Sequence, residues 1–237
     1  MKNIKQIYLK ELRSYFNGPM AYIFLVIFSL VNGYFFSNTF FIFGQSDMRA
    51  LFQIVPLVYL FFIPAITMGI ISKEKNIGTM EVMCTLPIKD FEFAIGKYLA
   101  ILSLLLVGLL LTSIMFFNLL AVGTNIDYGA IFTGYLGLFL AGSVYASMGL
   151  FASSLTDNQV VGFIIAIFFV LVFFLIDKLL IFMPNSISGT LQYLSIDYHL
   201  SNISRGVLDT RNLIYFLSMI SLFILLTIES LNSRKWD

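Results

Sequence analysis

Charge is what this sequence has least of: Asp, Glu, Lys and Arg make up 11% of its 237 residues, against about 25% in soluble domains. Hydrophobic residues make up 59%, and 26 residues are phenylalanine. So few charges cannot cover a surface that faces water, which excludes an ordinary soluble protein. The net charge of +1 provides no basic field for a polyanion, so we expect no nucleic-acid partner.

Cysteine and histidine are almost absent. Cys84 cannot form a disulfide within the chain, and His199 has no second histidine or nearby cysteine with which to hold zinc, which favours a structural role. No Ser-His-acid or Glu-rich metal constellation can be assembled. A phosphate-binding loop is missing as well, because Gly96-Lys97-Tyr98 lacks the upstream glycine and the hydroxyl residue. We therefore expect a non-enzymatic chain without a cofactor of its own.

Long uncharged runs are what the sequence does contain. A helix needs about 20 apolar residues to cross a bilayer, with a range of about 17–25. Six stretches qualify, although the last two are short enough to recruit the flanking polar residues Asp177, Lys178, Asn212 and Glu229. The stretches are 20–43, 50–72, 98–123, 130–155, 160–176 and 213–228. Such runs, rather than alternating ten-residue segments, predict an all-α polytopic membrane protein with one domain spanning 1–237.

The distribution of Lys and Arg predicts the orientation of these spans. Ten of the 14 basic residues fall at the termini and in the 73–97 segment, and four fall in the alternate connections. Cytoplasmic connections carry the excess of Lys and Arg. We therefore expect a multi-pass protein of the inner or plasma membrane with both termini cytoplasmic and residues 177–211 outside.

Three regions outside or within the spans have distinctive patterns. Apolar residues of the 4–16 stretch share one helical face, which predicts an amphipathic helix on the inner leaflet, ended by Gly18-Pro19. The 177–211 segment is rich enough in apolar residues to form either a re-entrant hairpin or a cap on the outer surface. In the fourth span, small residues at four-residue spacing predict close helix packing, namely the pairs Gly142/Ala146 and Ser143/Ser147.

The 72–87 segment predicts a short helix between the second and third spans. Gly78 ends the preceding structure, Thr79 is suited to the N-cap, and Pro87 stops the helix after about two turns. Glu81 suits the positive end of the helix dipole. The apolar residues Met80, Met83, Cys84 and Leu86 lie near one edge. Methionine is adaptable, so this edge suits docking on a moving partner, although a helix lying flat on lipid headgroups has the same spacing.

These residues resemble the cytoplasmic motif of ABC-2 type exporter permeases. The motif is carried by Glu74, Gly78-Thr79, Glu81, Pro87 and Gly96-Lys97. Stretches 153–159 and 198–212 resemble the family more weakly, and the latter is closest to permeases of the gliding-motility and copper-maturation type. The resemblance implies that the helix starting near Thr79 is a coupling helix. Its expected ATPase-coupling residues are Glu74, Gly78, Thr79, Met80, Glu81, Met83, Leu86 and Pro87.

The resemblance implies a permease subunit that couples ATP hydrolysis by a separate ATPase to export across the membrane. ATP and Mg would belong to an ABC ATPase dimer, and a second permease chain, identical or related, would complete the membrane part. An alternative is a non-transporting membrane subunit that transmits the conformational change driven by the ATPase to an extracytoplasmic partner or envelope machine. A secondary carrier is disfavoured because the spans are uncharged and show no repeat.

The single thiol provides a test of the orientation. We predict that Cys84 is not labelled by an impermeant maleimide in intact cells, because its segment is expected to face the cytoplasm. Opening the membrane should expose it, or removal of the ATPase should do so where that subunit shields it. Labelled and unlabelled chains are separated by the mass shift on a gel. Labelling of intact cells would reverse the orientation.

Overall fold

The computed structural model describes residues 2–42, 47–80, 88–123, 126–182, 189 and 191–233. Helices fill nearly all of these residues, and six are long and apolar enough to cross a membrane, which confirms the expected all-α, six-span class. They are α2 (Pro19–Ser37), α3 (Arg49–Thr67), α6 (Asp90–Val122), α7 (Tyr128–Leu155), α8 (Gln159–Leu179) and α11 (Thr210–Ser233). The last two are longer than their apolar runs because they include the polar residues at their ends.

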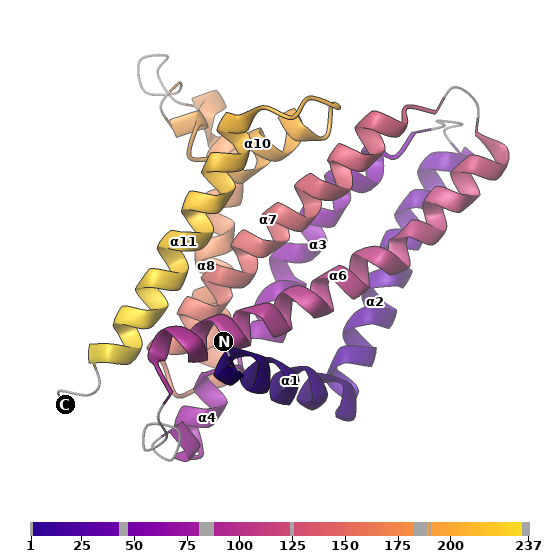
Figure 1. The fold of residues 1–237 in the computed structure, drawn as a ribbon. Helices are drawn as coiled ribbons and strands as arrows, with labels where there is room; N and C mark the ends of the chain where they lie inside the picture. Colours follow the sequence, from indigo (N-terminus) through magenta and orange to yellow (C-terminus); the bar gives the residue numbers. More distant parts are fainter. Residues whose placement is uncertain are drawn as a thin grey trace.

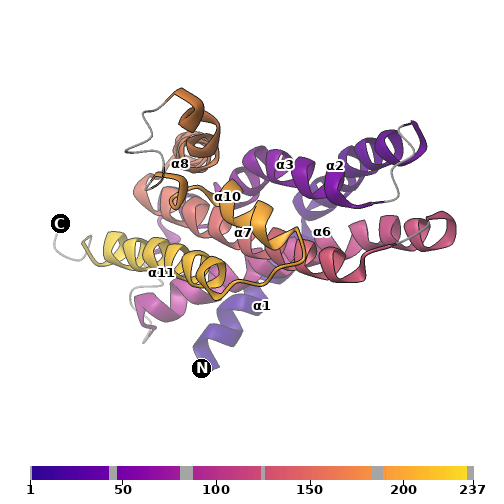
Figure 2. The same cartoon turned by 90° about the horizontal axis from the view of Figure 1, so that it is seen from above.

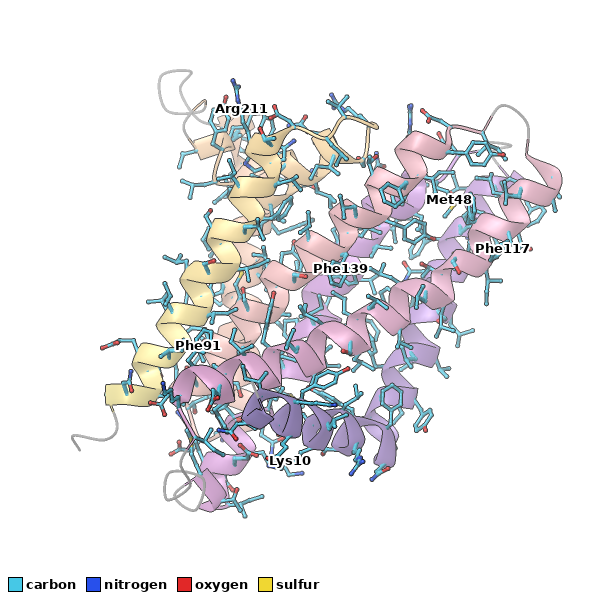
Figure 3. The ribbon with its side chains drawn as sticks, viewed as in Figure 1. Lys10, Met48, Phe91, Phe117, Phe139 and Arg211 are labelled. Carbon is cyan, nitrogen blue, oxygen red and sulfur yellow. The ribbon has the colours of Figure 1, made fainter. Side chains whose placement is uncertain are left out.

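The two ends of the bundle carry different short elements (Figure 1). At one end, α1 (Lys2–Asn17) lies across the bundle beside α4 (Ser72–Asn76). At the other end, the π-helical turn η1 (Asn38–Ile42) continues α2, the short turn η2 (Leu180–Phe182) follows α8, and α10 (Ile196–Ile203) precedes α11. We refer to these as the α1 end and the α10 end. Figure 3 shows Lys10 at the first and Arg211 at the second.

Helix α7 is the centre of the bundle, as the view from above shows (Figure 2). In the most apolar 18-residue stretch of α7, 78% of the residues are buried inside the chain, against 17% in the corresponding stretch of α8. Gly142 faces α6 and α3: a Cβ there would lie 2.7 Å from Leu105 Cδ2 and 3.1 Å from Tyr59 Cε2. Ser143, Ala146 and Ser147 are buried on the same helix. The small residues therefore lie where α7 approaches its neighbours most closely.

Helices α7 and α3 are in close contact at two glycines of α7. A Cβ at Gly149 would lie 2.0 Å from Thr67 Oγ1, and one at Gly134 would lie 2.2 Å from the Phe52 ring. No real side chain fits at such distances, so glycine is what lets these backbones meet. Outward-facing apolar residues such as Phe168 on α8 and Leu225 on α11 remain exposed, as expected where lipid is the solvent.

Helix α6 begins at Asp90, before the apolar run 98–123, and therefore includes Lys97. Its N-cap is Lys89, whose backbone N–H donates to Glu92 Oε2 at 3.3 Å. One local expectation needs correction. The apolar face of α1 packs mainly on protein rather than on lipid: Ile7 and Tyr15 are buried, and Tyr15 Oη donates to the Ile66 carbonyl at 2.9 Å.

The segment expected to form a re-entrant hairpin or a cap contains α10. This helix packs against α7 at the end of the bundle through Ile196, Leu200 and Ile203, all buried. His199 is buried in the same helix and bonds Asn212 Oδ1 through Nδ1 at 2.7 Å and the Tyr193 carbonyl through Nε2 at 3.0 Å. The histidine thus has a structural role, because its ring nitrogens join α10 to Tyr193 just before it and to Asn212 at the start of α11.

The close approach of α3 and α7 generates a stability prediction. Gly149→Ala should lower the melting temperature of the purified protein, because overpacking a tight contact costs about 1–3 kcal/mol. Gly33→Ala is the matched control, since its Cβ would lie 3.6 Å from Met115 Cε, an ordinary contact. Scanning fluorimetry in detergent compares the two. Equal melting temperatures would show that α3 and α7 are less tightly packed than described.

Candidate functional site

An ion-pair cluster at the α1 end joins three segments that are far apart in the sequence. Lys97 of α6 is 1% exposed, and its Nζ lies 2.8 Å from Glu11 Oε1 of α1 and 2.8 Å from Glu74 Oε2 of α4. The same ammonium donates to the Ile70 carbonyl at 2.7 Å. An ammonium has three protons to donate, and three acceptors surround this one. The buried charge therefore has two hydrogen bonds, to Glu11 and Ile70, and a second carboxylate, Glu74, at ion-pair distance.

Lys10 supplies the second cation of the cluster. Its Nζ donates to Glu74 Oε1 at 2.8 Å and lies 3.8 Å from Glu11 Oε1. Partial burial by itself lowers the pKa of the Lys10 ammonium, but the hydrogen bond and charge of Glu74 outweigh that effect and raise the pKa above its usual value. Two lysines therefore balance two glutamates, and the cluster carries no net charge.

Gly96 explains how α1 comes close enough for these pairs to form. A Cβ at this position would lie 2.8 Å from Ile7 Cβ and 3.2 Å from the Ile4 carbonyl oxygen. Only glycine allows α1 to lie so close to α6. The Gly-Lys pair thus combines a close helix contact with a charged anchor, and both act on α1.

The corner between α3 and α4 is fixed by the end of α7. Ser153 Oγ accepts hydrogen bonds from the backbone N–H groups of Ile71 and Ser72 at 3.1 and 3.0 Å, and it donates to the Met68 carbonyl at 2.9 Å. Lys75 Nζ donates to the carbonyl of Ser154. These contacts satisfy backbone groups that the turn leaves without helical partners. Ser153 and Ser154 belong to the 153–159 stretch that resembled the family.

The segment expected to couple to a partner follows this corner. Gly78 has φ +75°, a left-handed conformation that favours glycine, and Thr79 Oγ1 donates to the Glu74 carbonyl at 3.2 Å. Thr79 and Met80 are helical, and Met80 is half-buried against the core. Exposed Ile77 precedes them. The remaining expected residues, Glu81, Met83, Leu86 and Pro87, together with Cys84, lie outside the described residues.

The sequence and the structure differ on which residues make this site. Glu74 was expected to act in coupling, and its carboxylate is used inside the chain, on Lys97 and Lys10. Lys97 was expected in the helix that leads into the third span, and it is buried there. Glu11 and Lys10 were missed altogether. The available signal was Glu11, an acidic residue in an otherwise basic α1, but its partner Lys97 lies 86 residues further along and could not be recognised from the sequence.

The architecture defines a polytopic helical membrane protein whose first helix is anchored by charge to the turn after its second span. A comparison with protein families assigns it further. The family described as ABC-2 family transporter protein matches residues 48–228, from just before α3 into α11. The chain therefore belongs to this family and is a permease subunit of an ABC transporter. No functionally curated protein matches the sequence.

Removing the central cation should destabilise the protein strongly. Lys97→Met leaves Glu11 and Glu74 partly buried without their partner, which costs about 3–5 kcal/mol in comparable cases. Lys178→Met is the control, because its pair with Asp197 involves a side chain that is 53% exposed, and such pairs contribute about 0–1 kcal/mol. Chemical denaturation in mixed micelles measures both. Similar losses of stability would show that the Lys97 cluster does not hold the α1 end together.

Proposed function

We propose that this permease is driven by a separate pair of ABC ATPase subunits that engage the α1 end, and that it exports a substrate across the membrane. The observation that carries the proposal is the Lys97 cluster, which ties α1, α4 and α6 into one body directly before the expected coupling helix. A displacement of residues 79–87 would be transmitted to the rest of the bundle through these three connected helices. The resemblance of Gly78-Thr79 and Gly96-Lys97 to the family motif supports the same assignment.

The α1 end faces the cytoplasm in this proposal. The described α1 residues and the α4 corner contribute Lys5, Lys10, Arg13, Lys73 and Lys75 to that end. Arg49, Lys178, Arg205 and Arg211 lie at or near the α10 end. The excess of basic residues at the α1 end favours the cytoplasmic side for it and for both termini.

Transmission would proceed through rigid elements rather than through a flexible loop. Gly78 separates α4 from the expected coupling helix, and Glu74 lies one turn before it. Closure of the ATPases on ATP and Mg would displace the coupling helix, and the contacts of Glu74 with Lys97 and Lys10 would move α6 and α1 with it. Ser153 would carry the same displacement to α7.

The complete transporter would contain a second permease chain. Six spans are half of the number usual in such exporters, so two permeases with two ATPases form the simplest assembly, and a homodimer is the simplest pair. The weakly buried α8 leaves an apolar face on which lipid or a second copy can pack. The chain itself would hold neither ATP nor metal.

Substitutions in the expected coupling helix test the proposal. Met83→Asp should abolish co-purification of the ATPase and transport activity, because a carboxylate buried without a partner in an apolar groove costs several kcal/mol. Glu81→Lys should weaken both less, since it removes only a favourable dipole interaction of about 0.3–1 kcal/mol and adds a cation. Membrane abundance should be unchanged, because no span is altered. Quantitative affinity purification from cells that co-express both subunits measures the interaction.

A matched control introduces the same charge at the other end. Val207→Asp places a carboxylate on a side chain that is 64% exposed near α10, and it should leave ATPase co-purification unchanged. If Met83→Asp retained full ATPase binding and activity, residues 79–87 would lie on lipid headgroups and the proposed coupling would be wrong.

A further inference from the structure

An apolar groove lies between α6 and α7, on the half of the bundle nearer the α10 end. It has a volume of about 440 Å³ and a wall that is almost entirely aliphatic and aromatic, with Leu106 and Leu110 from α6 facing Phe132, Leu136 and Phe139 from α7. The stretch from Phe132 to Phe139 covers about 10 Å of helix axis. Phe132 and Leu110 are 69% and 60% exposed, so the groove is open to the surrounding lipid.

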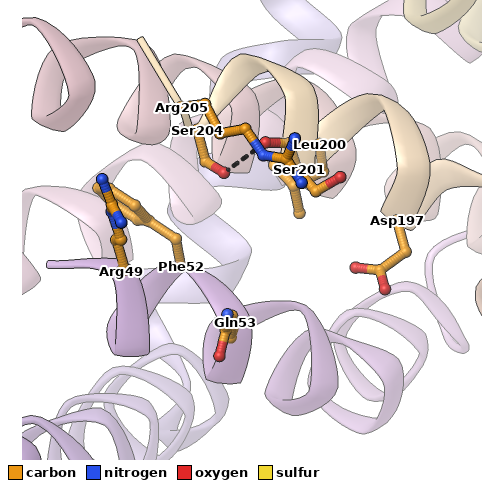
Figure 4. A pocket seen from close by; sticks show the side chains of 8 residues that line it. All are labelled: Arg49, Phe52, Gln53, Asp197, Leu200, Ser201, Ser204 and Arg205. Carbon is orange, nitrogen blue, oxygen red and sulfur yellow. Dashed lines mark hydrogen bonds between the residues drawn. The ribbon is translucent and has the colours of Figure 1, made fainter.

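A polar cavity of similar volume, about 440 Å³, lies at the α10 end itself (Figure 4). Arg49 and Gln53 extend from α3 on one side, and Ser201, Ser204 and Arg205 lie on the opposite side, in and after α10. Two guanidinium groups, two hydroxyls and the carboxylate of Asp197 border one space. Guanidinium groups bind phosphate oxygens through paired, charge-assisted hydrogen bonds.

A third, smaller cavity of about 230 Å³ adjoins both. It shares Arg49 and Phe52 with the polar cavity and Ile131 with the apolar groove. Ile131 lies near the start of α7, and Arg49 is the first residue of α3. The arginine-lined cavity and the apolar groove are therefore neighbours, with the smaller cavity and the side chains of Phe52 and Ile131 between them.

The carboxylates at this end are held by other groups, except for Asp47, which forms an exposed ion pair with Arg49. Asp197 accepts a hydrogen bond from Lys178 at 2.7 Å, and Asp127 accepts one from the backbone N–H of Ala130 at 3.1 Å, where it caps α7. Asp47 lies 3.9 Å from Arg49, both side chains being exposed. Within the described part of the chain, Arg205 forms no ion pair.

We propose that these adjoining spaces bind a phospholipid of the surrounding bilayer. Its phosphate would be held between Arg49 and Arg205, and one acyl chain would lie in the groove between α6 and α7. A cation pair at the membrane surface above an apolar groove complements an amphiphile with an anionic phosphate at one end. Neither half of the site is complementary to such a molecule alone. The site lies at the end opposite the proposed ATPase contact and does not depend on that contact.

Binding of defined lipids to the full chain tests both halves of the site. The chain is purified in detergent, stripped of lipid and titrated by native mass spectrometry with dioleoyl phosphatidylglycerol. Dioleoylglycerol, which has the same chains without the phosphate, and glycerol 3-phosphate, which has the phosphate without the chains, serve as comparisons. We expect each to bind about tenfold more weakly than the intact lipid, the change produced by losing one set of charge-assisted hydrogen bonds or the apolar contacts.

Variants assign the effect to the named residues. Arg49→Gln with Arg205→Gln should reduce phosphatidylglycerol binding about tenfold and leave dioleoylglycerol binding unchanged. Leu110→Trp, which fills the groove, should weaken both lipids. Arg13→Gln removes an exposed arginine at the opposite end and should change neither. All four substituted residues are exposed, so melting temperatures should match that of the unmodified chain.

Three results would overturn the proposal. Equal affinities for glycerol 3-phosphate and the intact lipid would reduce the site to a free-phosphate site without a role for the groove. Equal affinities for the two dioleoyl lipids would exclude recognition of the headgroup by the arginines. Unchanged phosphatidylglycerol binding in the double arginine variant would place the lipid elsewhere on the protein.

Discussion

The buried ammonium of Lys97 is the constraint on which the α1 end depends. A charge with 1% exposure is tolerated only where it is paired and hydrogen-bonded, and its partners come from α1, from α4 and from the turn between α3 and α4. Moving any one of these segments away would leave a charge unpaired in apolar surroundings. The three are therefore held as one unit, although Glu11 and Lys97 are separated by 86 residues.

Helix α7 connects that unit to the rest of the protein. Its last turn supplies Ser153 and Ser154 to the α3–α4 corner, and its first half bears α10 and the apolar groove. Glycines along its length bring neighbouring helices into direct contact. A close-packed helix with few voids transmits displacement as a rigid body. The proposed ATPase contact and the proposed lipid site thus lie at opposite ends of one stiff element, which is a suitable arrangement for a transporter of this family.

Gly96 and Lys97 are adjacent in the motif, but α6 requires each of them for a different physical reason. Gly96 has no side chain, so Ile7 occupies the place where one would be. Lys97 then reaches the carboxylates that this approach delivers. Replacing the glycine would move α1 away, and replacing the lysine would leave the glutamates unpaired. Gly96 and Lys97 of the motif thus form an internal junction, and exposed Ile77 lies just before the proposed ATPase contact.

The sequence by itself determined the class of this protein, because length and hydropathy decide whether a helix can cross a bilayer. Six spans, the amphipathic α1 and the turn at Gly78 follow from local patterns that need no knowledge of distant residues. Family membership was predicted from short motifs and confirmed over residues 48–228. The structure alone decided that Lys97 is buried, that Glu11 is its partner and that Arg49 and Arg205 border one cavity. Such pairs join residues far apart in the chain, and a single sequence holds no local signal for a contact that exists only once the helices have packed.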